Sequence, residues 1–290
     1  MQKRSILIQL DPDQHPSVFD RVVAIDAGTD EVFSYGSVTP SQVQGLIHGA
    51  IFTRGPADLK RTAVFIGGND VAKAEALLAE TRNHMIPGFG LQVSVMLDAN
   101  GCNTTASAAV RSAEKILKGP GHRALVLGGT GPVGQRAALL LAMGGFEVRL
   151  ASRQKSRSEA AAAAVTAFAL GSGKVDGIEC ASEAQLRAAL KDVQVVIAAG
   201  AAGICLLPES IWRDFPSLRV LVDLNAVPPL GIGGIEVMDK GVARHGASTF
   251  GALGVGSLKM KLHRKAIAQL FETNDQVLDA AQIHALELPG

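Results

Sequence analysis

The stretch GGTGPVGQR at positions 128–136 restricts the possible folds more than any other part of the chain. It lies between an apolar run, ALVL, and a run rich in alanine and leucine that favours a helix. The spacing G-x-G-x-x-G is met by Gly129, Gly131 and Gly134. Between a strand and a helix, the first glycine permits a tight turn, the second lets the backbone approach a pyrophosphate, and the third allows close helix–strand packing. We therefore predict a dinucleotide held at the N-terminus of the helix.

Short apolar runs alternate with longer helical runs through most of the sequence, as is typical of parallel sheets built from βαβ units. The predicted strands are SILIQL (5–10), VVAI (22–25), AVFIGG (63–68), LQVSVML (91–97), ALVLGG (124–129), EVRLAS (147–152), VQVVIAAG (193–200) and RVLVDLN (219–225). The predicted helices cover residues 70–83, 104–117, 132–144, 158–170, 182–191 and 258–271. The pattern predicts an α/β fold.

A break in this alternation divides the chain, whose 290 residues suffice for two domains. The segment KGPGHR (118–123) is rich in lysine, glycine and proline and reads as a linker. We expect one domain over residues 1–117 together with 255–290, and a doubly wound Rossmann-type domain over 118–254. The C-terminal helix should pack back on the first domain.

The composition excludes several classes of protein. The net charge is only +1, which gives no field for non-specific nucleic-acid binding. No apolar run approaches the roughly 20 residues of a membrane helix. Three cysteines without C-x-x-C spacing argue against a disulfide framework or a zinc site, so we expect no metal centre and a cytoplasmic location.

The residues after the strand EVRLAS indicate which dinucleotide is bound. An NAD-selective turn usually has Asp or Glu here for the ribose hydroxyl, whereas an arginine suits the 2′-phosphate of NADP. The sequence has Ser152, Arg153, Lys155 and Arg157, with no acid before Glu159. Guanidinium and ammonium groups favour a phosphate dianion, so NADP is the predicted cofactor. An ordinary solvated basic loop is the alternative.

The predicted cofactor contacts also include the ends of two later strands. Small residues end VQVVIAAG, as a nicotinamide lying over strand ends requires, although a simple turn would also explain them. A proline- and glycine-rich loop follows the strand RVLVDLN. The full predicted set is Gly129, Thr130, Gly131, Pro132, Val133, Gly134, Ser152, Arg153, Lys155, Arg157, Ala199 and Asn225.

Three other segments carry polar residues where a ligand could bind. DANGCNTTASAA (98–109) has more polar side chains than helix capping requires, because capping needs only one. HPSVFD (15–20) directly follows the first strand. FGALGVGSLKMKLHRKA (250–266) contains Lys259 and His263 on one helical face, but spacing alone does not choose between Lys259 and Lys261.

Together these motifs resemble the methylene-tetrahydromethanopterin dehydrogenases of methylotrophic bacteria, over almost the whole chain. The motifs that carry the resemblance are DPDQHPSVFD, VAIDAG, IFTRG, FIGGND, MLDANGCNTTA, GGTGPVG, VDLNAVPPLGIGGIE and FGALGVGSLKMKLHR. Within this family, the chain is similar to the NADP-dependent branch, some members of which also accept methylene-tetrahydrofolate. The resemblance implies a pterin domain, an NADP domain and a homo-oligomer, with a trimer as the candidate state.

The resemblance implies hydride transfer from the bridging methylene carbon of the pterin to C4 of the nicotinamide, in one-carbon metabolism. Ring nitrogen lone pairs drive hydride loss, so the protein must mainly align the two carbons. Lys259 corresponds to the family's lysine in the active-site cleft. Asp20 and Asp98 would be acidic groups near the pterin, with Asn103 and Thr105 as further contacts.

Two alternatives stay open at this point. A shikimate-type dehydrogenase would use the same fold but needs a Lys–Asp pair in its first domain, whereas the clear lysine candidate, Lys259, lies near the C-terminus. A catalytically silent protein that binds NADP or a pterin is the second alternative. The choice between methanopterin and folate substrates is also open.

Overall fold

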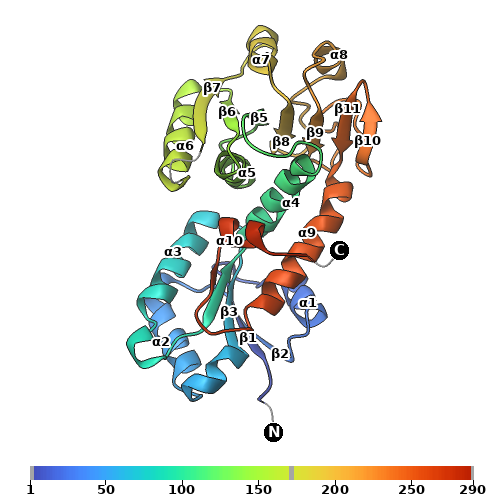
Figure 1. The fold of residues 1–290 in the computed structure, drawn as a ribbon. Coiled ribbons are helices and arrows are strands. Elements are labelled where there is room, and N and C mark those ends of the chain that lie inside the picture. The colour runs from blue at the N-terminus through green and yellow to red at the C-terminus, as the bar shows by residue number, and fades with distance from the viewer. Residues whose placement is uncertain (1–2, 170–172, 289–290) are drawn as a thin grey trace. The chain divides into compact units, whose positions relative to one another are not determined.

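The computed structural model describes residues 3–169 and 173–288, and the chain divides into two compact units (Figure 1). Unit 1 comprises Met1–Thr104 and Met260–Gly290, and unit 2 comprises Thr105–Lys259. The divisions fall inside helices α4 (Cys102–Glu114) and α9 (Ala252–Gln269), because each of these helices supplies residues to both units. The sequence-based boundaries, 117/118 and 254/255, lie close to an end of each helix and stay predictions.

Unit 1 is built on a five-stranded parallel sheet with the strand order β12-β4-β3-β1-β2. Its strands are β1 (Ile6–Leu10), β2 (Glu31–Tyr35), β3 (Thr62–Ile66), β4 (Ser94–Leu97) and β12 (Val277–Leu278). All five residues of β3 are buried, as expected of a central parallel strand covered on both faces. The sheet therefore joins the N-terminal and C-terminal parts of the chain.

The helices of unit 1 cover both faces of this sheet. They are α1 (Val18–Asp26), α2 (Pro40–Ile51), α3 (Val71–Asn83), α10 (Ala280–Ala285) and the last part of α9, with short 3₁₀ helices at Pro56–Arg61, Pro87–Phe89 and Ala99–Gly101. Ala266 and Ile267 of α9, and Leu270 directly after it, share one apolar cluster with Leu7 of β1 and Phe65 of β3. This packing confirms that the C-terminal segment returns to the first part of the chain.

The prediction of a strand at VVAI (22–25) is wrong, because these residues belong to helix α1. Ser17 caps this helix by accepting a hydrogen bond from the backbone N–H of Asp20. Val23 and Ala24 are both buried while Val22 and Ile25 are exposed, so burial does not alternate from residue to residue as it would in a strand. A short apolar run does not by itself distinguish the two structures.

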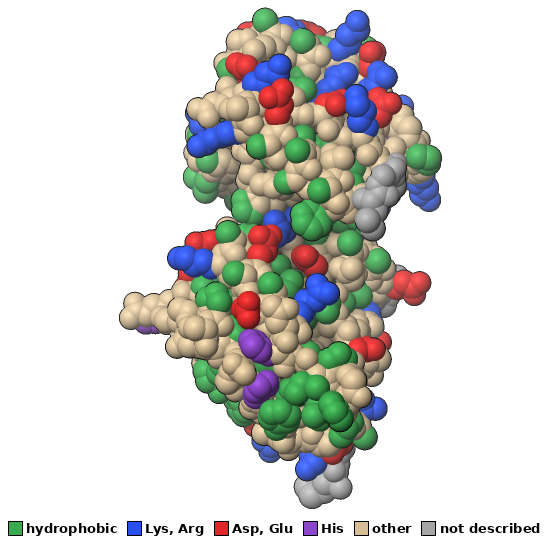
Figure 2. Space-filling model, turned by 90° about the vertical axis from the view of Figure 1, so that its left-hand side faces the viewer, with side chains coloured by type: hydrophobic (Ala, Val, Ile, Leu, Met, Phe, Trp, Pro, Cys, Tyr) green, Lys and Arg blue, Asp and Glu red, His purple; other side chains and the backbone are tan. Residues whose placement is uncertain are grey.

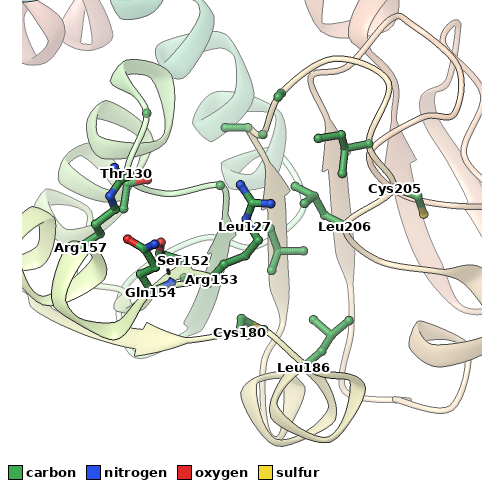
Figure 3. A pocket seen from close by; sticks show the side chains of 18 of the residues that line it. Leu127, Thr130, Ser152, Arg153, Gln154, Arg157, Cys180, Leu186, Cys205 and Leu206 are labelled. Atoms are coloured by element: carbon green, nitrogen blue, oxygen red, sulfur yellow. Dashed lines mark hydrogen bonds between the residues drawn. The ribbon is translucent and has the colours of Figure 1, made fainter.

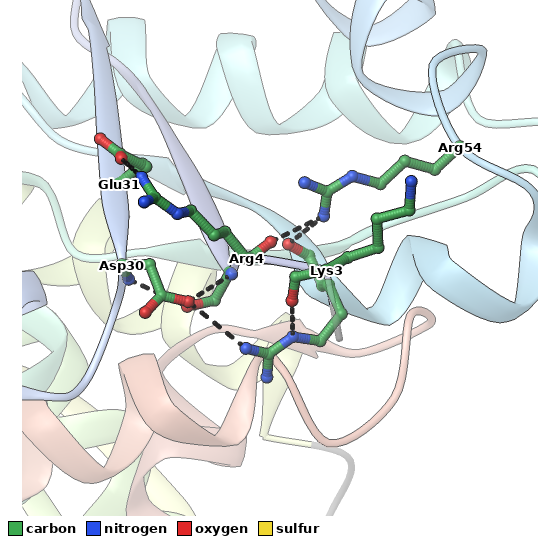
Figure 4. Close-up of polar contacts among 7 residues, drawn as sticks. Lys3, Arg4, Asp30, Glu31 and Arg54 are labelled. Atoms are coloured by element: carbon green, nitrogen blue, oxygen red, sulfur yellow. Dashed lines mark hydrogen bonds and ion pairs between the residues drawn. The ribbon is translucent and has the colours of Figure 1, made fainter. Parts of the chain in front are cut away.

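Hydrogen bonds connect the residues before β1 to Asp30, before β2, and to Arg54 (Figure 4). The Arg54 guanidinium donates to the carbonyl oxygens of Arg4 and Arg61, at 3.0 and 2.7 Å. Asp30 accepts hydrogen bonds from the backbone N–H and the hydroxyl of Ser5, which lower its pKa. These bonds fix the first strand in register beside β2.

Unit 2 is a seven-stranded sheet with the order β10-β11-β9-β8-β5-β6-β7. Its strands are β5 (Arg123–Leu127), β6 (Glu147–Ser152), β7 (Lys174–Glu179), β8 (Val195–Ala198), β9 (Val220–Asp223), β10 (Lys240–Arg244) and β11 (Ala247–Phe250). Only the pairing of β10 with β11 is antiparallel among the ladders of this sheet that the structure describes. From β5 the chain runs outward to β6 and β7, then returns to β8 on the other side. This reversal between β5 and β8 is the switch point of a doubly wound fold.

The helices of unit 2 are α5 (Pro132–Met143), α6 (Lys155–Phe168), α7 (Glu183–Leu190), α8 (Glu209–Trp212) and parts of α4 and α9. Helix α5 packs against strands β5, β6 and β8 and against α6. Helices α7 and α8 supply Leu190 and Trp212 to a core with Val196 of β8. The predicted α/β fold with a Rossmann-type domain is thus confirmed. The predicted helix 158–170 runs to Phe168, and residue 170 lies outside the described residues.

Acidic and basic side chains are intermingled over the face shown in Figure 2, in keeping with a net charge of +1. Within residues 3–169 and 173–288, the structure contains no helix with the length and apolar character to cross a bilayer.

Candidate functional site: a dinucleotide pocket and a carboxylate–histidine cluster

The glycine turn after β5 brings the backbone of two strand ends very close together. Gly128 adopts a φ of +68°, and a Cβ atom there would lie 2.5 Å from Cα of Gly200, after β8. A Cβ on Gly134 would lie 2.7 Å from Cα of Gly129. The tight-turn role predicted for Gly129 therefore belongs to Gly128, since only Gly128 has the left-handed conformation. Gly129 instead needs to be small because a Cβ would lie 2.6 Å from Leu150 Cγ.

Gly131 is the N-cap of α5, and Pro132 occupies the first turn. Glycine has no side chain with which to cap the helix, so Gly131 makes no capping hydrogen bond to the backbone N–H groups of the first helical turn. A Cβ at Gly131 would have its nearest neighbour at 3.7 Å, an ordinary van der Waals contact, so the protein does not crowd the backbone there. This is the arrangement that binds phosphate at a helix N-terminus.

A cavity of about 550 Å³ opens beside this helix end, wholly within unit 2 (Figure 3). Among the predicted cofactor residues, those that line it are Thr130, Gly131, Ser152, Arg153, Arg157 and Ala199. Figure 3 shows Thr130, Ser152 and Arg157 on one side of the pocket and Cys205 on the other. The volume is in the range of cofactor pockets.

The basic loop after β6 contributes two arginines to the cavity. Arg153 and Arg157 are exposed and lie in its lining. Lys155 lies between them in sequence but is 3.6 Å from Glu159 Oε1, one helical turn away, and is absent from the described lining of the cavity. The two guanidinium groups therefore bring positive charge to the lining, whose Glu183 carboxylate is paired with Arg187 at 2.9 Å.

The remaining predicted cofactor residues do not belong to the described lining of the cavity. Gly129, Pro132, Val133 and Gly134 form the turn and helix start but are not in the described lining. Asn225 donates to the Pro229 carbonyl oxygen at 3.1 Å and accepts from the Val227 N–H at 2.9 Å. Its amide thus shapes the loop after β9, and a contact with the cofactor stays a prediction.

Sequence reasoning missed one wall of the pocket. This wall comprises Cys180, Ala181, Ser182, Glu183 and Leu186, after β7, together with Gly200, Cys205 and Leu206 after β8. Strand β7 carries Lys174, Asp176 and Gly177, which hid it from a search for apolar runs. Gly200 could have been noticed at the end of VQVVIAAG, where the expected need for small residues already pointed.

In unit 1, Asp98 follows β4 and organises the start of α4. Its Oδ1 accepts from the backbone N–H groups of Asn103 and Thr104, at 2.9 and 3.0 Å, and its Oδ2 accepts from the Thr104 hydroxyl at 2.6 Å. The side chain is fully buried. Asp98 is therefore a structural anchor, and direct contact with a substrate stays a prediction.

Two other predicted substrate residues belong to the same region. Asn103 is fully buried and donates to the Leu97 carbonyl oxygen at 2.6 Å and to Asp279 Oδ1 at 2.8 Å. This amide joins α4 to the C-terminal helix α10. Thr105 is half-buried. Lys259, in the middle of α9, is half-buried, whereas Lys261 is exposed.

Asp20 lies at the carboxyl edge of the parallel sheet of unit 1, where His263 joins it. The Nε2 atom of His263 is 3.8 Å from Asp20 Oδ1, and its Nδ1 atom is 3.9 Å from Asp98 Oδ2. His263 is fully buried, and the Asp20 side chain retains 13% exposure. The carboxyl edge of a parallel sheet is the usual ligand-binding edge of such folds. Asp20 and Asp98, predicted from sequence, are thus brought together by a histidine that sequence reasoning noticed but gave no role.

Solved structures share this fold at low sequence identity. A shikimate 5-dehydrogenase from Mycobacterium fortuitum matches with a TM-score of 0.54 and 14% identity, over 98% of each chain. At this identity the likeness establishes the fold alone.

Sequence comparisons are more specific. Residues 18–100 match the family model described as methylene-tetrahydromethanopterin dehydrogenase, N-terminal. The bifunctional protein MdtA of Methylorubrum extorquens AM1 is 44% identical over 98% of both chains. The NAD(P)-dependent methylenetetrahydromethanopterin dehydrogenase of the same organism is 33% identical over 99% of both chains. The chain therefore belongs to the methylene-tetrahydromethanopterin dehydrogenase family.

Proposed function

We propose that this protein oxidises methylene-tetrahydromethanopterin to the methenyl form with NADP⁺ as the hydride acceptor. The observation that carries the proposal is the cavity of unit 2, where an uncapped helix N-terminus and two arginines meet, in a chain of this family. The shikimate-type alternative is not favoured, because the structural likeness at 14% identity extends to the fold alone.

The residues of the cavity fit a dinucleotide. Gly131 leaves room where a Cβ would fill the space beside the first turn of α5, and the N–H groups there would hold the pyrophosphate. Ala199 and Gly200 leave the end of β8 free of large side chains. When bound, the cofactor supplies a nicotinamide carbon that accepts a hydride. The protein's own contribution is to bind, orient and enclose this group.

NADP, rather than NAD, is proposed because of the basic loop after β6. Arg153 and Arg157 reach the cavity, and an arginine fork binds a phosphate through two parallel N–H bonds. Within the loop 152–157 there is no carboxylate to accept a hydrogen bond from a ribose hydroxyl, and Glu183 on the facing wall is paired with Arg187 at 2.9 Å. The 2′-phosphate of NADP would therefore be held more tightly than the hydroxyl of NAD.

Pterin binding is assigned to the acidic edge of unit 1. The amino and N–H groups of a pterin ring are donors, and a carboxylate such as Asp20 is an acceptor for them. We retain Lys259 as the catalytic candidate, with Asp98, Asn103 and Thr105 as supporting residues for the pterin. Because the substrate's own nitrogens stabilise the cation that forms, these residues need only orient the ring and exclude water.

The proposal is tested by following NADPH absorbance with the purified chain. The four reactions combine NADP⁺ or NAD⁺ with methylene-tetrahydromethanopterin or methylene-tetrahydrofolate, with a control lacking pterin. Reduction of NADP⁺ with the methanopterin substrate, at a higher kcat/KM than with NAD⁺, is expected. No reduction with either pterin would overturn the function, and a preference for NAD⁺ would overturn the cofactor assignment. Activity with the folate, a homo-oligomeric (trimeric) state and a cytoplasmic location are further expectations of the proposal.

A further inference from the structure

His263 lies at the centre of the carboxylate cluster of unit 1. Its two ring nitrogens face Asp20 and Asp98 at 3.8 and 3.9 Å, which are ion-pair distances rather than short hydrogen bonds. The ring stacks on Phe65, with centroids 5.7 Å apart and planes inclined by 16°, and the Phe19 ring lies 6.1 Å away. The two phenyl rings thus restrict the imidazole plane while each nitrogen faces one carboxylate.

The two carboxylates differ in what else holds them. Asp98 is fully buried and accepts three hydrogen bonds at the start of α4, so its position is fixed by the fold. Asp20, in the first turn of α1, is the one of the pair that keeps some exposure. Asp20 is therefore the carboxylate that a ligand can reach, and Asp98 is the anchor behind it.

A third acid makes the position of Asp20 electrostatically demanding. A Cβ built on Gly67 would lie 3.4 Å from Asp11 Oδ2 and 3.5 Å from Asp20 Oδ2, so both acids flank this glycine. Asp11 accepts hydrogen bonds from the backbone N–H groups of Asp13 and Ser17, and burial raises its pKa. When both are ionised, two carboxylates that border the same glycine repel each other. A protonated His263 would offset that repulsion.

We propose that His263 is a positioning residue: anchored by Asp98, it holds the Asp20 carboxylate where Asp20 accepts hydrogen bonds from the pterin ring. The inference rests on the proposed function, since it takes the pterin as substrate. A pterin offers an amino group and a ring N–H side by side, and the two oxygens of one carboxylate can accept from both. A histidine that faces two carboxylates can donate to both only when both of its nitrogens carry protons.

The test is a double-mutant cycle with His263→Gln and Asp20→Asn, read through the two Michaelis constants. We expect each single variant to raise KM for methylene-tetrahydromethanopterin about 10-fold or more, the loss of a charged hydrogen bond. KM for NADP⁺ should stay within about twofold. The double variant should be no worse than Asp20→Asn alone, because His263 acts through Asp20. Additive losses, or a parallel rise of KM for NADP⁺, would overturn the proposal.

His84→Gln is the matched control, because this histidine pairs with Glu80 at 3.3 Å elsewhere in unit 1. It should leave both KM values unchanged. If His263→Gln does not fold, Asp20→Asn alone decides, since an unchanged pterin KM in that variant removes the group that His263 is said to position. A wild-type protein without pterin-dependent activity refutes the proposed function, whereas an active wild type with an unaffected His263→Gln variant refutes this inference alone.

Discussion

Arg244 donates two hydrogen bonds to the buried carboxylate of Asp239, from Nε to Oδ2 at 2.8 Å and from Nη2 to Oδ1 at 2.9 Å. The Thr249 hydroxyl donates to the same carboxylate at 2.7 Å. These bonds tie β10, β11 and the turn before them together at the edge of the large sheet. A two-point contact of this kind is stronger than an ordinary exposed ion pair.

Replacing Asp239 with Asn should lower the free energy of unfolding by about 2–3 kcal/mol, the usual loss for a charged hydrogen bond in a partly buried setting. Asp176→Asn is the control, because its pair with Lys174 is exposed and should cost under about 0.5 kcal/mol. Urea unfolding of the variants measures both values. Equal effects of the two substitutions would contradict this account of the Asp239 site.

The same carboxylate predicts sensitivity to acid. Burial raises the pKa of Asp239, but the hydrogen bonds from Arg244 and Thr249 outweigh it, so the net pKa lies below the ordinary 3.8. A group with a lowered folded-state pKa stabilises the fold above its unfolded value, and that contribution disappears as pH falls through the folded value. The difference in stability between wild type and Asp239→Asn should therefore be complete at pH 6 and shrink below about pH 4. An unchanged difference at pH 3 would be the contrary result.

Two glycines of the cofactor turn should respond differently to alanine. In Gly134→Ala the new methyl group meets the backbone of Gly129 at 2.7 Å, so unfolding free energy should fall by about 1–3 kcal/mol. In Gly131→Ala the nearest atom is 3.7 Å away, so Tm should hold while KM for NADP⁺ rises about 10-fold or more. Thermal melts and steady-state kinetics on both variants distinguish the roles. The account fails if Gly131→Ala keeps normal cofactor affinity.

The arginines of the basic loop should set the preference for NADP. Arg153→Gln and Arg157→Gln should each raise KM for NADP⁺ by about 10- to 100-fold and change KM for NAD⁺ little. Lys155→Gln, which removes a lysine paired with Glu159 outside the described lining, should have a smaller effect. Kinetics with both cofactors provide the measurement. If Lys155→Gln had the largest effect, the arrangement of the loop around the phosphate would have to be revised.

Cysteine reactivity offers a test of where the cofactor lies. Cys205 is exposed in the lining of the cavity, so saturating NADP⁺ should slow its alkylation by iodoacetamide at least several-fold. Burial raises the pKa of Cys180 to about 11, so this thiol should stay unreactive at pH 8 and gain reactivity towards pH 11. Buried Cys102 is the internal control. Mass spectrometry of the labelled peptides measures each rate of alkylation. A rate at Cys205 that NADP⁺ leaves unchanged would contradict cofactor binding in this cavity.

Most of unit 2 could be predicted from sequence because each apolar run there is a buried parallel strand beside a helix with clear periodicity. The glycine turn gave the site, yet the left-handed residue was Gly128 rather than Gly129, since the motif does not specify φ. Strand β7 escaped because it lies at the sheet edge with charged residues exposed. Because β7 was not predicted, the residues that follow it, Cys180 among them, were not recognised as lining of the cavity.

Unit 1 was harder to predict for a different reason. Its sheet is completed by β12 from the C-terminal segment, a contact that no local pattern contains. The same long-range return brings His263 to Asp20 and Asp98. Sequence reasoning found the polar residues after β4, but it could not show that both carboxylate oxygens of Asp98 accept hydrogen bonds from the start of α4. Sequence indicated the candidates, and packing separates anchors from ligand-facing groups.

The most direct test of the central claim follows a deuterium label from substrate to cofactor. Methylene-tetrahydromethanopterin carrying two deuterium atoms on its bridging carbon is incubated with the protein and NADP⁺, and the reduced cofactor is examined by mass spectrometry. The account predicts NADPH that is heavier by one deuterium, located at C4 of the nicotinamide, with the second deuterium kept by the methenyl product. NADPH formed without deuterium, or no NADPH at all, would contradict it.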